Sequence, residues 1–201
     1  MLKRVLCLAL ILPAFALTGA MVRAQSGADV QRISTYLNAL TTLSGNFVQT
    51  NPDGTVNEGR FYIRKPGLMR FEYEPPNMAL VIADGVWVGV VDRTSDADAQ
   101  RYPLSETPLD LLLRDRVNLA QEGTVRQIEK SNGQLRVTAG DPDDPSAGRL
   151  TLVFSDRPLE LRQWIVVDDK GDVTTVLLSE IKRGIALNRA LFSIEAAELD
   201  R

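Results

Sequence analysis

Turn signals at short intervals divide most of this chain into consecutive β-hairpins. Apolar runs alternate with "NPDGT", Asp84-Gly85, Asn132-Gly133, Arg157-Pro158 and "DDKGD". Such signals between two apolar runs are typical of turns that join antiparallel strands. The chain has no strand–helix–strand alternation and no internal repeat, so we expect an antiparallel meander of about ten strands. The expected strands cover residues 47–50, 56–65, 68–73, 124–130, 134–139, 149–154, 160–167 and 173–182, with a hairpin over 78–91.

An amphipathic helix precedes the strands. Val30, Ile33, Leu37 and Leu40 recur at helical spacing, and polar side chains lie between them. We expect this helix to pack on the sheet and to end at Ser44-Gly45.

A short leucine-rich segment, "ETPLDLLLRD", interrupts the strands. Thr107 can cap a helix there, Pro108 suits the first helical position, and Leu109, Leu112 and Leu113 then share one face. Because loops flank this segment, we expect a lid rather than a crossover helix. One more helical turn is expected in "GIALNRALF". A sheet this long curls, so the sequence predicts an α+β fold: a strongly curled antiparallel sheet forming an unclosed β-barrel with a short helical lid.

The first 24 residues have the pattern of a secretory signal peptide. Lys3 and Arg4 precede an apolar run, and small residues end at Ala24. The run is too short for a membrane span, and Cys7 lies inside it, whereas a lipid-modified protein would carry the cysteine just after it. We therefore expect cleavage near Ala24, export, and a single mature domain over residues 25–201.

The composition argues against several functional classes. Removing Lys3, Arg4 and Arg23 from the 23 basic residues leaves 20 against 26 acidic residues, a net charge of −6 that argues against nucleic-acid binding. The chain contains no histidine, so Ser-His and Cys-His catalysis and the commonest metal ligand are absent. The acidic run at 141–144 lacks the spacing of a calcium site, and we expect a solvated turn. We expect no metal ion, no other cofactor and no enzymatic activity.

Large apolar side chains recur along the strands around the Asp84-Gly85 turn and in the leucine-rich segment. Two interpretations stay open. The side chains form ordinary core packing between sheet and helices, or they line an apolar pocket that a curled sheet leaves unfilled. The candidate lining residues are Met69, Phe71, Leu80, Ile82, Trp87, Leu109 and Leu112.

A basic pair precedes the break at Pro66-Gly67. Strand alternation directs Arg64 and Lys65 to opposite faces, so one of them points toward whatever covers the sheet. In one interpretation both side chains extend into solvent. In the other, one of them forms a latch by reaching the carbonyl groups at a helix end. The pattern leaves open which of the two would do so.

The order of these features resembles the LolA family, periplasmic carriers that bring lipoproteins to the outer membrane of Gram-negative bacteria. The resemblance spans nearly the whole mature chain. Its elements are "LSGNFVQT", "GRFYIRKPGLMRFEYEPP", "LVIADGVWV" and "TPLDLLL". They are similar to the family's Phe-x-Gln element, its Arg-Pro-Gly and aromatic block, its Asp-Gly hairpin and its Thr-Pro helix. The tail "FSIEAAELD" lacks the Pro-Gly ending typical of the family.

The resemblance implies a periplasmic chaperone whose apolar cavity binds the acyl chains of lipoproteins and carries them from the inner to the outer membrane. The implied partners are lipoproteins, an inner-membrane ABC-type lipoprotein-releasing transporter and an outer-membrane acceptor, and we expect a monomer. The resemblance matches Lys65 to the family's lid-latching arginine. It also matches Met69 and Phe71 to the aromatic block and Leu109 and Leu112 to the lid.

Two other functions remain as alternatives. One is a periplasmic lipid-binding or sensor module with the same half-barrel fold, which would bind a signalling partner instead of a lipoprotein. The other is a hydrolase that uses carboxylates, which requires two Asp or Glu side chains about 5 to 9.5 Å apart in one cleft.

Overall fold

The structure is a computed structural model that describes residues 18–121, 124–140, 146 and 148–200. The basic and apolar parts of the expected signal peptide lie before residue 18, and the acidic turn expected at 141–144 also lies outside the described residues. The first helix, α1 (Thr18–Ala39), runs through the expected cleavage point near Ala24, and cleavage there stays a prediction.

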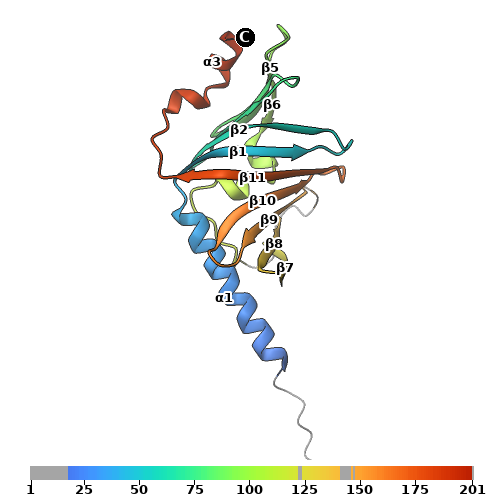
Figure 1. The fold of residues 1–201 in the computed structure, drawn as a ribbon, viewed down its shortest axis with the longest axis vertical. Helices are drawn as coiled ribbons and strands as arrows, with labels where there is room; N and C mark the ends of the chain where they lie inside the picture. Colours follow the sequence, from blue (N-terminus) through green and yellow to red (C-terminus); the bar gives the residue numbers. More distant parts are fainter. Residues whose placement is uncertain (1–17, 122–123, 141–145, 147, 201) are drawn as a thin grey trace, which may run out of the picture.

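Eleven antiparallel strands of the described chain form one curled sheet (Figure 1). Their bounds are β1 (Thr42–Thr50), β2 (Val56–Arg64), β3 (Leu68–Tyr73), β4 (Ala79–Asp84), β5 (Trp87–Asp92), β6 (Gln100–Pro103), β7 (Val125–Ser131), β8 (Gln134–Ala139), β9 (Arg149–Ser155), β10 (Glu160–Val167) and β11 (Val173–Arg183). The strand order is β6-β5-β4-β3-β2-β1-β11-β10-β9-β8-β7. The predicted α+β fold with an antiparallel sheet is confirmed, although the short strand β6 was not expected.

The strand order divides the expected meander into two halves. The chain enters in the middle of the sheet at β1, proceeds outward to the edge strand β6, and starts again at the opposite edge with β7. The two halves meet where β1 pairs with β11. The segment after β6 must therefore lead from one edge of the sheet to the other, and the short helix that the sequence predicts as a lid lies in this connection.

This connecting segment contains the 3-10 helix η1 (Leu104–Glu106) and the short helix α2 (Asp110–Leu113). Most of its leucine side chains are buried in the core on the concave side of the sheet, and Leu109 packs against that core partly buried. The sequence predicts Thr107 as the cap of this helix, but Leu109 occupies the cap position of α2. The Thr107 hydroxyl instead donates a hydrogen bond to the Leu104 carbonyl (2.9 Å).

The helix α1 confirms the expected amphipathic pattern, since Ile33 and Leu37 are fully buried. It ends at Ala39, however, and Ser44 and Gly45 lie in β1. A Cβ atom at Gly45 would lie 2.5 Å from the Ser179 carbonyl oxygen on β11. This glycine therefore allows close strand packing and does not end the helix.

A charged network attaches α1 to the far half of the sheet. Arg32 contacts the carboxylates of Asp29 (2.9 Å) and Asp156 (3.1 Å), and Lys130 on β7 lies 3.2 Å from Asp156. Hydrogen bonds from Arg32 and Lys130 lower the pKa of Asp156. These contacts hold the helix across the concave side, where Tyr36 packs on Phe154.

A contact across the interior of the sheet shows how strongly the sheet curls. Phe71 on β3 and Trp164 on β10 have ring centroids 5.7 Å apart, although three strands separate β3 from β10 in the sheet. In the described residues no strand pairing joins the edges β6 and β7, so the barrel is unclosed. The concave interior is a hydrophobic core formed by the sheet, α1 and the connecting segment.

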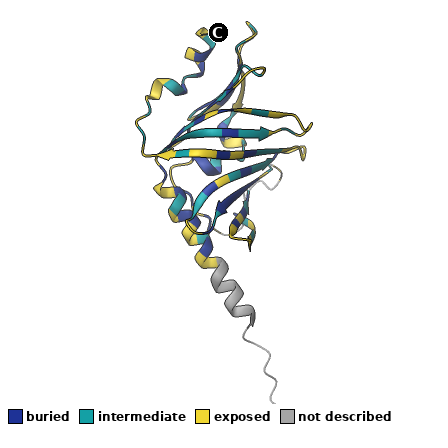
Figure 2. Ribbon diagram, in the orientation of Figure 1, coloured by how far each residue is buried: buried dark blue, intermediate teal, exposed yellow. Residues whose placement is uncertain are grey.

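A second hydrophobic cluster lies on the outer face of β3, β4 and β5. Residues 184–200, which we call the C-terminal strap, cover it with η2 (Arg189–Phe192) and α3 (Ile194–Leu199) (Figure 1). The expected helical turn in "GIALNRALF" is confirmed as η2, whereas α3 was not predicted. Buried and less buried positions alternate along the strands in Figure 2, and the strap buries apolar side chains on the outer face of β3, β4 and β5.

Candidate functional site

An open cavity of about 190 Å³ lies between the concave face of the sheet and the start of α2. Five strands (β1, β3, β4, β10 and β11) and the connecting segment contribute its wall, and most of the lining is apolar. The lining residues are Gln49, Met69, Phe71, Tyr73, Val81, Leu109, Trp164, Val166, Thr174 and Val176.

Strand alternation positions the aromatic wall. Met69, Phe71 and Tyr73 all lie on the inward face of β3, because each is two residues from the next. Phe71 contacts the ring of Phe47 on β1 (4.5 Å between centroids) in addition to Trp164. Phe71 and Trp164 therefore join two distant strands within the cavity wall.

Polar side chains gather at one end of this cavity. Tyr73 ends β3, Gln49 lies near the end of β1, and Thr174 lies near the start of the antiparallel β11, so all three occupy the same end of the sheet. The Tyr73 hydroxyl donates a hydrogen bond to Gln49 Oε1 (2.7 Å). Burial raises the pKa of Tyr73 to about 12, because the charged phenolate would lose its hydration there.

The connecting segment contributes Leu109, which is half-buried, to the lining of the cavity. The far end of α2 is fixed by the β2–β3 turn, where the Gly67 N–H donates to the Leu113 carbonyl (2.9 Å). Gly67 has φ +76° and a Cβ atom there would lie 2.8 Å from Gly85, so the turn requires glycine. The Asn38 side chain then bonds both the N–H (2.8 Å) and the carbonyl (3.0 Å) of Val117.

Both members of the basic pair reach backbone carbonyls. Lys65 Nζ donates to the Leu37 carbonyl in the last turn of α1 (3.0 Å), and Arg64 donates to the Leu187 carbonyl in the C-terminal strap (2.8 Å). Partial burial lowers the pKa of Lys65, and the carboxylate of Asp115 opposes this shift. Lys65 thus contacts a helix end, as one interpretation expected, but that helix is α1 and not α2.

The structure divides the expected lining residues between two faces. Met69, Phe71 and Leu109 line the cavity. Leu112 is buried in the concave core beside it. Leu80 and Ile82 lie under the C-terminal strap, on the opposite face of β4, because they alternate with the inward-facing Val81.

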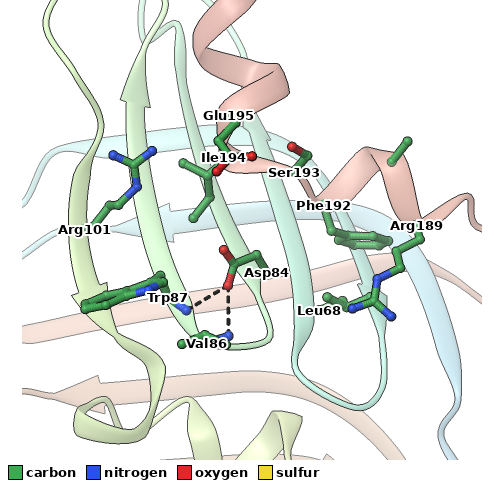
Figure 3. A pocket seen from close by; sticks show the side chains of 11 residues that line it. Leu68, Asp84, Val86, Trp87, Arg101, Arg189, Phe192, Ser193, Ile194 and Glu195 are labelled. Atoms are coloured by element: carbon green, nitrogen blue, oxygen red, sulfur yellow. Dashed lines mark hydrogen bonds between the residues drawn. The ribbon is translucent and has the colours of Figure 1, made fainter.

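Trp87 also lies on the outer face, where it is 42% exposed. Figure 3 shows it beside Arg101, in a hollow of about 720 Å³ between the strap and the ends of β3 to β6. Asp84 accepts hydrogen bonds from the backbone N–H groups of Val86 (2.9 Å) and Trp87 (2.8 Å), which form the β4–β5 turn.

Several cavity residues were not predicted from the sequence. Tyr73 is two residues beyond Phe71, so the alternation that places Met69 and Phe71 on one face of the strand also predicts Tyr73 there. Val81 lies between Leu80 and Ile82 and faces the cavity, whereas the two larger side chains face the strap. Trp164 and Val176 are distant in sequence and reach the cavity only through the pairing of β1 with β11 and the curl of the sheet.

The comparison with protein families identifies the fold. Residues 38–195, which is more than half of the chain, match the family described as Outer membrane lipoprotein carrier protein LolA. The chain belongs to the LolA family. This family comprises carriers and not enzymes, so the carboxylate hydrolase is not supported.

Individual relatives agree with this assignment. The chain is 28% identical over 194 residues to an outer-membrane lipoprotein carrier protein of Pseudomonas aeruginosa, covering 92% of both chains. It is 26% identical to the protein of the same name from Azotobacter vinelandii, covering 98% of this chain and 96% of the other. Lipoprotein carriage is therefore the function that its relatives' names support.

One solved structure supports the same fold. A putative outer membrane lipoprotein-sorting protein domain from Vibrio parahaemolyticus superposes with a TM-score of 0.50, covering 87% of this chain and 99% of that one, at 9% identity. At this identity the likeness concerns the fold alone.

The described residues also bear on two other classes of site. They contain no group of three or more His, Cys, Asp or Glu side chains that could hold a metal ion. Within the same part of the chain, no helix has the length and hydropathy needed to cross a membrane.

Proposed function

We propose that this LolA-family protein is a periplasmic chaperone that holds an acyl chain of a lipoprotein in the concave cavity and carries it from the inner to the outer membrane. The cavity under α2 is the observation that supports this function, because its aromatic and aliphatic wall suits a hydrocarbon chain. Met69, Phe71 and Leu109 are the expected lining residues on which the proposal rests.

The energetics require a protected carrier. Burying one methylene group is favourable by about 0.8 kcal/mol, so moving a 16-carbon chain into water costs on the order of 12 kcal/mol. A lipoprotein therefore needs a protein that shields its acyl chain in an aqueous compartment. The chain has no phosphate-binding loop, so the energy of loading must come from a partner.

The cavity must enlarge when cargo enters. Its volume of about 190 Å³ lies below the ~300 to 1,000 Å³ typical of ligand sites. The end of α2 near Leu113 is attached to Gly67, whereas Leu109 at the other end lines the cavity. We expect cargo to displace the Leu109 end of the lid, while Gly67 and Asn38 keep the far end in place.

The proposed partners follow from this role. An inner-membrane ABC-type transporter would load the carrier, an outer-membrane acceptor would receive the lipoprotein, and the carrier would act as a monomer. Export and cleavage near Ala24 would place the mature chain in the periplasm.

A release assay tests the proposal. Purified mature protein is incubated with spheroplasts of a Gram-negative bacterium whose lipoproteins are labelled, and the medium is examined for a soluble complex of carrier and lipoprotein. We expect a complex that survives gel filtration and whose mass spectrum contains an intact acylated lipoprotein. Leu109→Glu, at a half-buried lining residue, should reduce the yield of complex while retaining the native circular dichroism spectrum. A medium free of complex, together with no acyl ligand in the native mass spectrum, would contradict the proposal.

A further inference from the structure

The polar end of the cavity has an arrangement that hydrocarbon binding alone does not require. Gln49, Tyr73 and Thr174 are the polar members of an otherwise apolar lining. They lie together at one end of the strands, where Val166 is paired with Thr174 and Val176 with Gln49, whereas Met69 lies near the other end of β3. The polar groups of the cavity are therefore gathered at one end, where they could meet the polar group of a ligand that has a hydrocarbon tail.

The Gln49 amide is held in a chain of hydrogen bonds. Its Oε1 accepts from the Tyr73 hydroxyl (2.7 Å), and its Nε2 donates to Asn51 Oδ1 (2.6 Å). Asn51 in turn donates to the Thr55 hydroxyl (2.9 Å), which donates to Asp53 (2.7 Å). The β1–β2 turn thus fixes the amide before any ligand arrives, which reduces the entropy lost on binding.

This arrangement leaves one donor available. A glutamine amide carries two N–H donors, and among the described residues Asn51 is the one acceptor for Gln49 Nε2. The second N–H belongs to a half-buried side chain that lines the cavity. A polar group in such a place gains from a partner of the opposite hydrogen-bonding type, which here is an oxygen acceptor.

We propose that Gln49, positioned by Tyr73 and Asn51, donates a hydrogen bond to the carbonyl oxygen of the acyl ester or amide whose hydrocarbon chain occupies the cavity. The inference rests on the proposed function and adds a preferred ligand class, acyl carbonyl compounds over ethers of the same length. Tyr73 and Asn51 act as positioning residues, since they orient the amide and do not themselves have to touch the ligand.

The test is a competition between matched ligands. Bound cis-parinaric acid is displaced from the mature protein by dioctanoylglycerol or by its dioctyl ether, which lacks the carbonyl groups. One neutral hydrogen bond should give the ester an advantage of about 2- to 10-fold over the ether. A second pair, N-octanoylethanolamine and the octyl ether of ethylene glycol, measures the same preference for an amide carbonyl and so distinguishes the two carbonyl sources.

Variants assign the preference to Gln49. Gln49→Met should bring the ratio of ester to ether affinity close to one and leave the ether affinity within about 2-fold, because one hydrogen bond is lost and the apolar contacts remain. Tyr73→Phe should lower the ratio partly, because the amide loses its orienting partner. Gln163→Met is the matched control, since Gln163 lies on β10 next to Trp164 and faces away from the cavity.

The outcomes separate the inference from the proposed function. Equal affinities for ester and ether in the wild-type protein, or an unchanged preference in Gln49→Met, would overturn the role of Gln49 and leave acyl-chain binding intact. Failure of cis-parinaric acid and of all four competitors to bind the wild-type protein would instead overturn the proposed function. If Gln49→Met does not fold, the wild-type ratio and Tyr73→Phe decide the question.

Discussion

The two faces of β4 are both apolar in sequence and differ in what covers them. On the concave face, Phe71 and Val81 border a cavity. On the outer face, Leu80 and Ile82 are sealed by the C-terminal strap, and Ile82 is fully buried. The C-terminal strap on the outer face and the segment containing α2 on the concave face also differ in how they are attached to the sheet. The comparison teaches that alternation along a strand predicts which residues share a face, but a distant segment decides which face stays open.

The attachments of the two covers explain this difference. The strap is attached to the sheet along its length. Arg64 and Arg70 donate hydrogen bonds to two of its carbonyl groups, those of Leu187 and Leu191 (3.1 Å for Leu191). Farther along the strap, Glu198 contacts Arg101 on β6 (2.7 Å). Glu198 also accepts a hydrogen bond from the Ala99 N–H (2.8 Å). The lid is fixed at Leu113, whereas Leu109 contributes a side chain to the cavity. We therefore expect substitutions on the outer face to change mainly the free energy of unfolding, and substitutions on the concave face to change mainly the affinity for a ligand.

The largest expected effect tests the strap. Phe192 is 2% exposed in the outer cluster, so Phe192→Ala should lower the free energy of unfolding by about 3–5 kcal/mol. The folded variant should still bind cis-parinaric acid with an affinity within about 2-fold of wild type. Denaturant unfolding and a binding titration measure the two quantities. Leu199→Ala in the same strap is the control, because Leu199 is 86% exposed and its loss should cost less than about 0.5 kcal/mol.

The next effect concerns Tyr73 at the polar end of the cavity. Its folded pKa of about 12 lies above the ordinary value of 10.0, so the folded state keeps a proton that the unfolded state releases between these values. The contribution of Tyr73 to the free energy of unfolding is complete below pH 10 and declines as the pH rises toward 12, by about 2–3 kcal/mol. An ultraviolet titration of tyrosinate should contain a component near pH 12 that Tyr73→Phe removes. Persistence of this component in the variant would assign it to another tyrosine.

A charge on the lid should weaken ligand binding with a smaller cost to folding. Leu109 is half-buried, so Leu109→Glu should be tolerated by the fold, but the carboxylate would have to lose water when an acyl chain enters. We expect an affinity for cis-parinaric acid about 10-fold lower than wild type. Val86→Glu places the same charge on the outer face, at a residue 66% exposed, and should leave the affinity unchanged. Equal losses in both variants would show that the two faces are not distinct.

The smallest effects separate the two basic residues. Lys65→Met and Arg64→Met each remove one hydrogen bond to a carbonyl and should each cost about 1 kcal/mol. The two variants should differ in how their free energy of unfolding depends on pH. Because the pKa of Lys65 is lowered in the folded state, the unfolded state binds more protons between that value and 10.5, and wild-type stability gains from this group as the pH rises through the window. Unfolding measured across this range should lose that gain in Lys65→Met and keep it in Arg64→Met.

Much of the fold was predictable because its signals are local. The turns at Asp84-Gly85 and Asn132-Gly133 placed the strands on either side of them to within a few residues. The amphipathic face of α1 was equally clear from Ile33 and Leu37. These features depend on neighbouring residues alone, and the sequence contains those neighbours.

The cavity was harder to predict because its wall is assembled from distant segments. Phe71 and Trp164 meet only after the sheet has curled, and nothing near Trp164 in the sequence indicates that contact. Leu80 and Ile82 were expected in the cavity because the sequence does not reveal that residues 184–200 return to cover their face. The end of α1 was misplaced for a related reason, since Gly45 serves a close contact with β11.

The two tryptophans allow a direct test of which face binds the acyl chain. Trp164 lies in the cavity wall and Trp87 lies on the outer face, and the chain contains no other tryptophan. Trp87→Phe and Trp164→Phe each leave one of them, and a brominated fatty acid quenches the fluorescence of an indole that it contacts. We predict saturable quenching of Trp164 in Trp87→Phe and little quenching of Trp87 in Trp164→Phe. Quenching confined to Trp87 would contradict the concave cavity as the site of acyl-chain binding.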